Sequence, residues 1–119
     1  MFKQSTRGEG RFIRQNASGG SRYGHIILQV DPHPGGPFAW SWEVPESEVP
    51  ARFEPWVLQG IHKLFEPNAK FGGCELSGFS VRVVGGSFHE TDSSEMAFTA
   101  AGAFAFQDAL EQAGGANAV

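Results

Sequence analysis

The sequence has a single cysteine, no long apolar run and no nucleotide-binding motif. Cys74 cannot form an internal disulfide, which is in keeping with a reducing compartment. No apolar run approaches the roughly 20 residues that a bilayer-spanning helix needs. The residues after Met1 also lack the apolar stretch of a secretory signal. We therefore expect a cytoplasmic protein, without membrane association and monomeric.

Motifs that mark catalytic or metal sites are also missing. There is no Gly-x-x-x-x-Gly-Lys-Ser/Thr run, no Cys-x-x-Cys pair and no His-Glu-x-x-His spacing. His89 near Ser93 and Ser94 suggests a hydrolase, because a nucleophile needs a base nearby. Serines at a helix start are equally expected for capping. We predict no catalytic residue, no metal and no cofactor in this chain.

The charge is modest but unevenly distributed. The 119 residues carry a net charge of −4, and 119 residues suit one domain. Residues 1–25 contain five basic side chains and one acidic one, whereas the rest of the chain is strongly acidic. A basic end can contact phosphate. Ordinary solvated surface charge explains the same pattern.

Hydrophobic periodicity predicts four strands and two helices. Strands are expected at residues 11–15, 23–30, 38–44 and 79–83, and helices at 55–65 and 96–112. The prolines of residues 31–37 are expected to exclude that segment from a central strand. Asp92 and Glu95 have the spacing of a capping box before the second helix, with Ser93 beside them.

These elements predict an α+β domain. A four-stranded sheet with two helices on one face makes a two-layer sandwich over residues 1–113. The first two strands would form an antiparallel hairpin with a long tip. Residues 114–119 are expected to be a disordered tail.

Two glycine-bearing loops contain aromatic, histidine and basic side chains. They are residues 16–22 and residues 84–91. Such groups suit stacking and phosphate contact with RNA. Plain loop sequence is the alternative.

The second loop carries a longer motif. The run Gly85-Gly86-Ser87-Phe88-His89-Glu90-Thr91-Asp92-Ser93-Ser94-Glu95-Met96-Ala97-Phe98 resembles the elongation factor G signature Asp-Gly-Ser-Tyr-His-Glu-Val-Asp-Ser-Ser-Glu-Met-Ala-Phe. Further matches are Arg14-Gln15, Ser18-Gly19-Gly20-Ser21-Arg22-Tyr23-Gly24-His25 and Val49-Pro50-Ala51-Arg52-Phe53. The chain therefore resembles domain IV of this family over nearly its whole length.

The resemblance implies a ribosomal protein S5 domain 2-like fold and a role in translation. In the family this domain mimics the anticodon arm of tRNA, and its two tip loops enter the A site on the small ribosomal subunit during translocation. The implied partners are the small ribosomal subunit, the tRNA and mRNA at the A site, and the other domains of a parent GTPase that binds GTP and Mg²⁺. By residue, the resemblance implies tip contacts at Gly19, Gly20, Ser21, Arg22, Tyr23, Ser87, Phe88, His89 and Glu90, supported by a helix cap at Asp92, Ser93 and Glu95.

Departures from the family pattern indicate a divergent member. The first loop lacks the family's Gly-Gln before Tyr23, and Cys74-Glu75 replaces an aromatic-Pro pair. The alternatives are a domain of a ribosome-protection factor, or a stand-alone interaction domain that has lost its work on the ribosome.

Overall fold

Four strands and two α-helices make up the described part of the chain. The computed structural model describes residues 1–15 and 21–114. The elements are β1 (Thr6–Arg14), β2 (Arg22–Pro37), β3 (Ala39–Trp42), a 3₁₀ turn η1 (Ala51–Phe53), α1 (Glu54–Leu64), β4 (Ser77–Ser87) and α2 (Glu95–Gln112). Of the predicted disordered tail, residues 114–119, Gly114 is described and lies in a turn after α2, whereas residues 115–119 fall outside the described residues.

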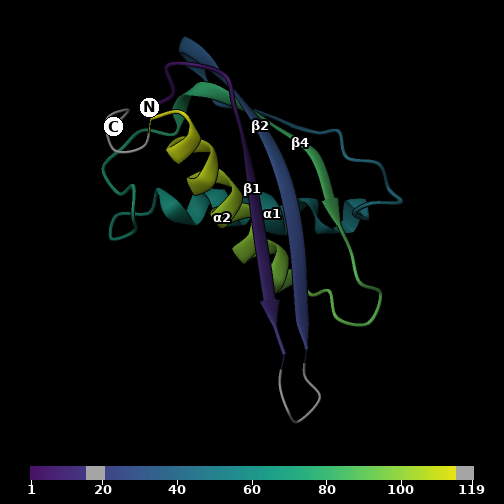
Figure 1. Ribbon diagram of the computed structural model, residues 1–119. Coiled ribbons are helices and arrows are strands. Elements are labelled where there is room, and N and C mark those ends of the chain that lie inside the picture. Colours follow the sequence, from purple (N-terminus) through teal and green to yellow (C-terminus); the bar gives the residue numbers. More distant parts are fainter. Residues whose placement is uncertain (16–20, 115–119) are drawn as a thin grey trace.

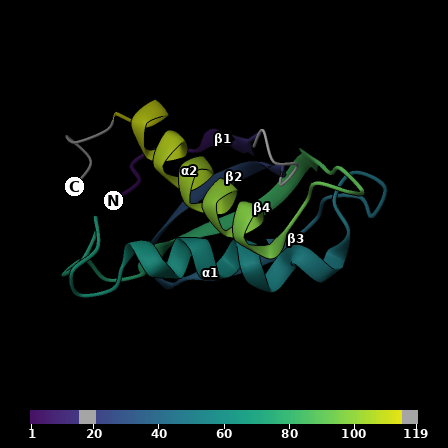
Figure 2. The ribbon, with the colours of Figure 1, turned by 90° about the horizontal axis from the view of Figure 1, so that it is seen from below.

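The four strands form one mixed sheet. Their order is β1-β2-β4-β3, with β1 and β4 antiparallel to β2 and with β3 parallel to β4. Both helices lie on the same side of this sheet, as Figure 2 shows. The predicted α+β sandwich and its β1–β2 hairpin are therefore confirmed.

The core lies between the sheet and the helices. It consists of every second residue of the strands and of helix residues about one turn apart. Ile26, Leu28 and Val30 alternate along β2 and are fully buried, as are Val81 and Val83 on β4. The helix α1 contributes its buried side chains one turn apart, and a set of phenylalanines fills the space between the layers. Burial of this apolar face holds the two layers together.

Small residues bring α2 very close to β1. Ala101 and Ala105 are fully buried on the helix face that meets the strand. A Cβ atom added at Gly8 would lie 2.1 Å from the carbonyl oxygen of Ala105, and one added at Gly10 would lie 2.1 Å from that of Ala101. Only glycine allows the strand and helix backbones to approach to this distance.

The predicted strand at residues 23–30 ends too early, although residues 31–37 are, as expected, not part of a strand paired on both sides by described residues. The strand β2 continues through Pro32 to Pro37, with a register shift between these two prolines. The reason is that β1 pairs with β2 only as far as Val30. Beyond that point one side of β2 has no strand partner among the described residues, so the missing proline N–H groups interrupt no ladder there.

The predicted capping box at Asp92 was also wrong. The helix α2 begins at Glu95, and its N-cap is Ser94, whose Oγ accepts a hydrogen bond from the Ala97 N–H at 3.2 Å. Asp92 and Ser93 lie before the cap, in the loop. Both serines suit a helix start equally well, and the backbone path alone selects Ser94.

The domain has two distinct ends. Met1 and the C-terminal end of α2 lie at one end in Figure 1, whereas the end of β1 and the start of β2 point the opposite way. The described residues extend 46 by 30 by 21 Å, so the domain is elongated. Among these residues, no helix is long and apolar enough to cross a membrane.

Candidate functional site

The start of β2, directly after the first loop, meets the second loop and the residues that follow it at the end of the domain away from Met1. The first loop joins β1 to β2, and the second joins β4 to α2. The Tyr23 N–H donates a hydrogen bond to the Asp92 carbonyl oxygen at 3.0 Å, and Tyr23 forms a parallel β-bridge with Ser93. The Tyr23 and His89 rings are 4.4 Å apart between centroids. Tyr23 at the start of β2 and residues 89–93 thus form one surface, which is called the tip below.

The second loop is closed by Ser93. Its Oγ accepts a hydrogen bond from the His89 N–H at 2.9 Å, and its own N–H donates to the His89 carbonyl oxygen at 2.9 Å. The His89 side chain is 58% exposed, and its Nδ1 lies 3.9 Å from an Asp92 carboxylate oxygen. The loop therefore holds the backbone of His89 firmly while its ring projects to solvent.

Phe88 points the other way, toward the body of the domain. Its ring packs on Phe53 of η1 at 5.7 Å between centroids. The Arg52 guanidinium covers both rings, at 4.6 Å from the Phe53 centroid and 5.3 Å from that of Phe88. Arg52 belongs to the quoted resemblance but was given no role there, because only the folded chain brings η1 to the tip.

Two arginines face each other across the hairpin. Arg14 and Arg22 are register partners in the β1–β2 ladder, and both are exposed. Like charges directly opposite each other in a ladder are unfavourable. Neither guanidinium takes part in an ion pair with a described residue. This end of the sheet therefore has positive charge available for an anion.

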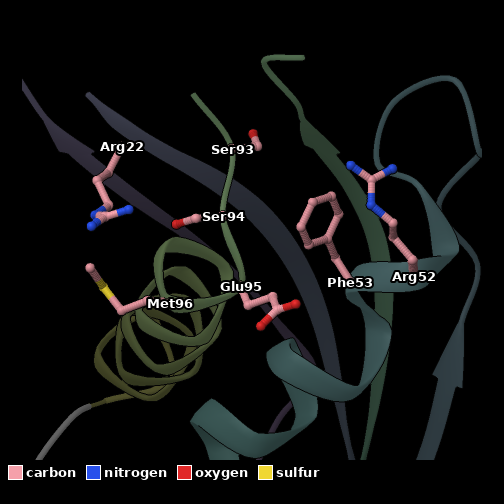
Figure 3. A pocket seen from close by; sticks show the side chains of 7 residues that line it. All are labelled: Arg22, Arg52, Phe53, Ser93, Ser94, Glu95 and Met96. Atoms are coloured by element: carbon pink, nitrogen blue, oxygen red, sulfur yellow. The ribbon is translucent and has the colours of Figure 1, made fainter. Parts of the chain in front are cut away.

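A shallow open groove runs beside the tip, with a volume of about 510 Å³. Figure 3 shows Arg22 and Arg52 on its two sides, with the start of α2 between them. Phe53, Ser93, Ser94, Glu95 and Met96 complete its lining. The Glu95 carboxylate keeps the groove from being uniformly cationic.

The other predicted tip residues take different positions. Ser21 is half-buried, Glu90 is exposed, and Ser87 ends β4 beneath the loop. Gly19 and Gly20 fall outside the described residues. Within residues 1–15 and 21–114, no three side chains of His, Cys, Asp or Glu gather in a way that could hold a metal ion.

Comparison with known proteins relates the chain to one part of a translation factor. The family described as "Elongation factor G, domain IV" matches residues 1–114. The chain is 37% identical over 107 residues to the elongation factor G of Aquifex pyrophilus, covering 89% of this chain and 15% of that protein. A crystal structure of a Thermus thermophilus protein superposes with a TM-score of 0.80 at 26% identity, covering 94% of this chain and 16% of that one. The chain therefore spans less than a fifth of the length of these relatives.

Proposed function

This chain belongs to the elongation factor G family, as a counterpart of its domain IV, and we propose that it is the ribosome-contacting part of a translational GTPase. The observation that carries the proposal is the joint tip. Tyr23, at the start of β2, packs on His89 of the second loop and donates a backbone hydrogen bond to Asp92. Side chains from β2 and from the second loop that are held together in this way can enter a narrow RNA site as a unit.

In this proposal the tip enters the A site on the small ribosomal subunit during translocation. The elongated domain stands in for the anticodon arm of a tRNA, and the tip contacts the paired tRNA and mRNA. Exposed Arg22 would contact phosphate, and the rings of Tyr23 and His89 would stack on bases or riboses. Ser21, Ser87, Phe88 and Glu90 would shape the loops around these contacts. Gly19 and Gly20, which fall outside the described residues, are further contact residues in this proposal.

Local charge supports RNA contact despite the net charge of −4. Arg14 and Arg22 face each other at the tip, and Arg52 lies across the groove from Arg22. The phosphate backbone contributes much of the affinity in such complexes and is attracted by clustered arginines. Acidic side chains elsewhere would limit binding to RNA in general and favour the tip.

The chemistry of the parent protein lies elsewhere. We propose that this chain has no catalytic residue, and that GTP and Mg²⁺ belong to the GTPase domain of the parent. Its partners would be the small ribosomal subunit, tRNA and mRNA, and the other domains of that factor. A role on ribosomes would put the protein in the cytoplasm.

The proposal is tested by footprinting. A chimera in which this chain replaces the matching region of the Aquifex pyrophilus factor is bound to ribosomes with a non-hydrolysable GTP analogue. Chemical probing of the ribosomal RNA should then reveal protection in the decoding region. Glycine–serine replacement of residues 18–23 and 87–90 should remove that protection.

The native factor is the positive control, and GTP binding and circular dichroism check that each chimera is folded. Protection that depends on both loops, together with translocation in single-round kinetics, supports the proposal. Protection without translocation but with release of a bound antibiotic would favour a ribosome-protection factor. A folded, GTP-bound chimera without protection would leave a stand-alone interaction domain as the better interpretation.

A further inference from the structure

Beneath the tip, four polar side chains from three strands form a continuous chain of contacts. The Tyr23 hydroxyl lies 2.5 Å from the Ser87 Oγ, which lies 2.9 Å from Nδ1 of His25. Nε2 of His25 is in turn hydrogen-bonded to a carboxylate oxygen of Glu9. The contacts run across the sheet from β2 and β4 to β1, on the face away from the helices.

The donor and acceptor of each of these hydrogen bonds follow from the protonation of the side chains. An ionised carboxylate can only accept, so Nε2 of His25 carries the proton that Glu9 receives. In the neutral ring Nδ1 is then an acceptor, so the Ser87 hydroxyl donates to it. With His25 neutral, the Ser87 oxygen accepts in turn from the Tyr23 hydroxyl, so that both hydroxyls donate toward Glu9. With both ring nitrogens protonated, Nδ1 donates to Ser87 and the two hydroxyl donors reverse, while the same four side chains stay connected.

The network ends at the aromatic ring on which His89 rests. The Tyr23 ring is held at its hydroxyl by Ser87, and the Tyr23 backbone is held by the hydrogen bond to Asp92. The His89 ring packs against the Tyr23 ring with an interplanar angle of 48°. The His89 side chain is itself 58% exposed, and its Nδ1 also lies 3.9 Å from an Asp92 carboxylate oxygen.

These polar groups lie outside the hydrophobic core. The His25 side chain is 10% exposed, and the Glu9 side chain is 54% exposed and also lies 3.8 Å from Arg11. A fully hydrogen-bonded polar network favours one arrangement of its side chains over others, because hydrogen bonds are directional. Apolar packing of the same area is less selective for one arrangement. The network therefore fixes the orientation of side chains at the tip.

We propose that Glu9, His25, Ser87 and Tyr23 are positioning residues that hold the His89 ring in one orientation at the tip. The proposal rests on the proposed function for its biological meaning, because that function makes His89 a contact residue. The positioning itself is a property of this chain and can be measured without a ribosome.

The test is NMR spectroscopy on the 119-residue chain. Ser87→Ala interrupts the network at its centre, and Tyr23→Phe keeps the ring but removes the hydroxyl. Both should shift the His89 ring signals, because the ring current of residue 23 would average over several orientations. Exchange of the Tyr23 amide, which donates to Asp92, should become about tenfold faster, as expected for loss of one hydrogen bond of ordinary net strength.

Thr6→Val is the matched control. It also removes one hydroxyl hydrogen bond, to the Ala109 carbonyl oxygen, but at the other end of β1. It should leave the His89 signals unchanged, and Ser87→Thr, which restores a hydroxyl, should return them toward those of the unchanged chain.

Unchanged His89 signals in folded Ser87→Ala and Tyr23→Phe would overturn the positioning role, and so would equal shifts in Thr6→Val. This outcome is independent of the footprinting result. A chain whose network passes the NMR test yet gives no ribosomal protection would contradict the proposed function alone.

Discussion

At the scale of single residues, two adjacent serines have separate structural tasks. Ser94 caps α2 through the Ala97 N–H, whereas Ser93 closes the second loop through the backbone of His89. Sequence alone could not separate them, because either side chain has the chemistry of a cap. The separation predicts that their substitutions affect different properties.

Ser94→Ala should lower the free energy of unfolding by about 1 kcal/mol, the usual cost of losing an N-cap. Urea denaturation followed by circular dichroism measures this change. Ser93→Ala is the matched control. It should have a smaller effect on global unfolding but should speed exchange of the His89 amide. The reverse pattern, with Ser93 dominating global stability, would contradict the assignment of the cap.

The facing arginines predict opposite effects on stability and on RNA binding. Arg22→Gln should leave stability unchanged or raise it by a few tenths of a kcal/mol, because it removes a like-charge pair with Arg14. If Arg22 contacts phosphate, the same change should weaken ribosome binding. It should also reduce the slope of log affinity against log salt concentration by about one.

Thermal unfolding and binding at several salt concentrations measure the two effects. Lys70→Gln, a change of the same charge on an exposed residue outside the tip, is the control for net charge. Equal losses of binding in both variants would mean that overall charge, and not the tip, controls affinity.

At the scale of elements, the contact between β1 and α2 brings two backbones unusually close. Gly8 and Gly10 on alternate positions of β1 meet the helix at the carbonyl oxygens of Ala105 and Ala101. The two faces of β1 therefore differ in their side chains: the glycines face the helix, and the charged side chains face solvent. The close approach also allows Thr6 to donate a hydrogen bond to Ala109.

Gly10→Ala should therefore destabilise the domain by about 3 kcal/mol or more, at or beyond the upper end of ordinary overpacking, because the clash is with backbone atoms. Gly85→Ala is a matched control, since its added Cβ would meet the flexible Ile27 side chain at 3.3 Å. It should change stability by less than about 1 kcal/mol. Comparable losses in urea denaturation for both variants would contradict the importance of the strand–helix contact.

At the scale of the whole molecule, an ion-pair cluster ties the sheet together on its solvent face. Arg82 of β4 lies 3.4 Å from Asp31 of β2 and 3.3 Å from Glu43 after β3. The pKa of Asp31 is held below its usual value by a hydrogen bond from Ser5 first, and then by Gln29 and Arg82, against the opposing effect of burial. The pKa of Glu43 is lowered by Ser41 first and then by Arg82.

Both carboxyls have folded pKa values below those of the unfolded chain. Their contribution to stability is therefore present above the unfolded values, near pH 4, and is lost as the pH falls through the lower folded values. Arg82→Met should lower Tm at about pH 7, and the difference from the unchanged chain should narrow toward about pH 3.

Arg7→Met is the control for this prediction, because Arg7 contacts the neutral amide of Gln29 at 3.4 Å. Its effect on Tm should not depend on pH over the same range. If the difference in Tm between Arg82→Met and the unchanged chain stays constant with pH, the packing of the Arg82 side chain, and not its charge, contributes the stability.

The sequence by itself determined the type and order of the main elements, the α+β class and the family, but not the bounds of the strands. Alternation in β2 and β4 and the helical spacing of Val57 and Ile61 are local signals, and each survives folding because the same residues face the core. The signature around His89 is likewise contiguous in the chain. Such features need no knowledge of which segments become neighbours.

Tertiary structure decided what depends on neighbours distant in the sequence. The strand β1 begins at Thr6, opposite Val30, so β2 can continue through its prolines without a partner on that side in the described part of the chain. The path of the second loop selects Ser94 as the cap of α2. Tyr23 meets Ser87 and His89 across more than sixty residues of chain. Hydrogen bonds and ring contacts act over only a few ångströms, so sheet pairing had to bring these groups together before they could form one tip.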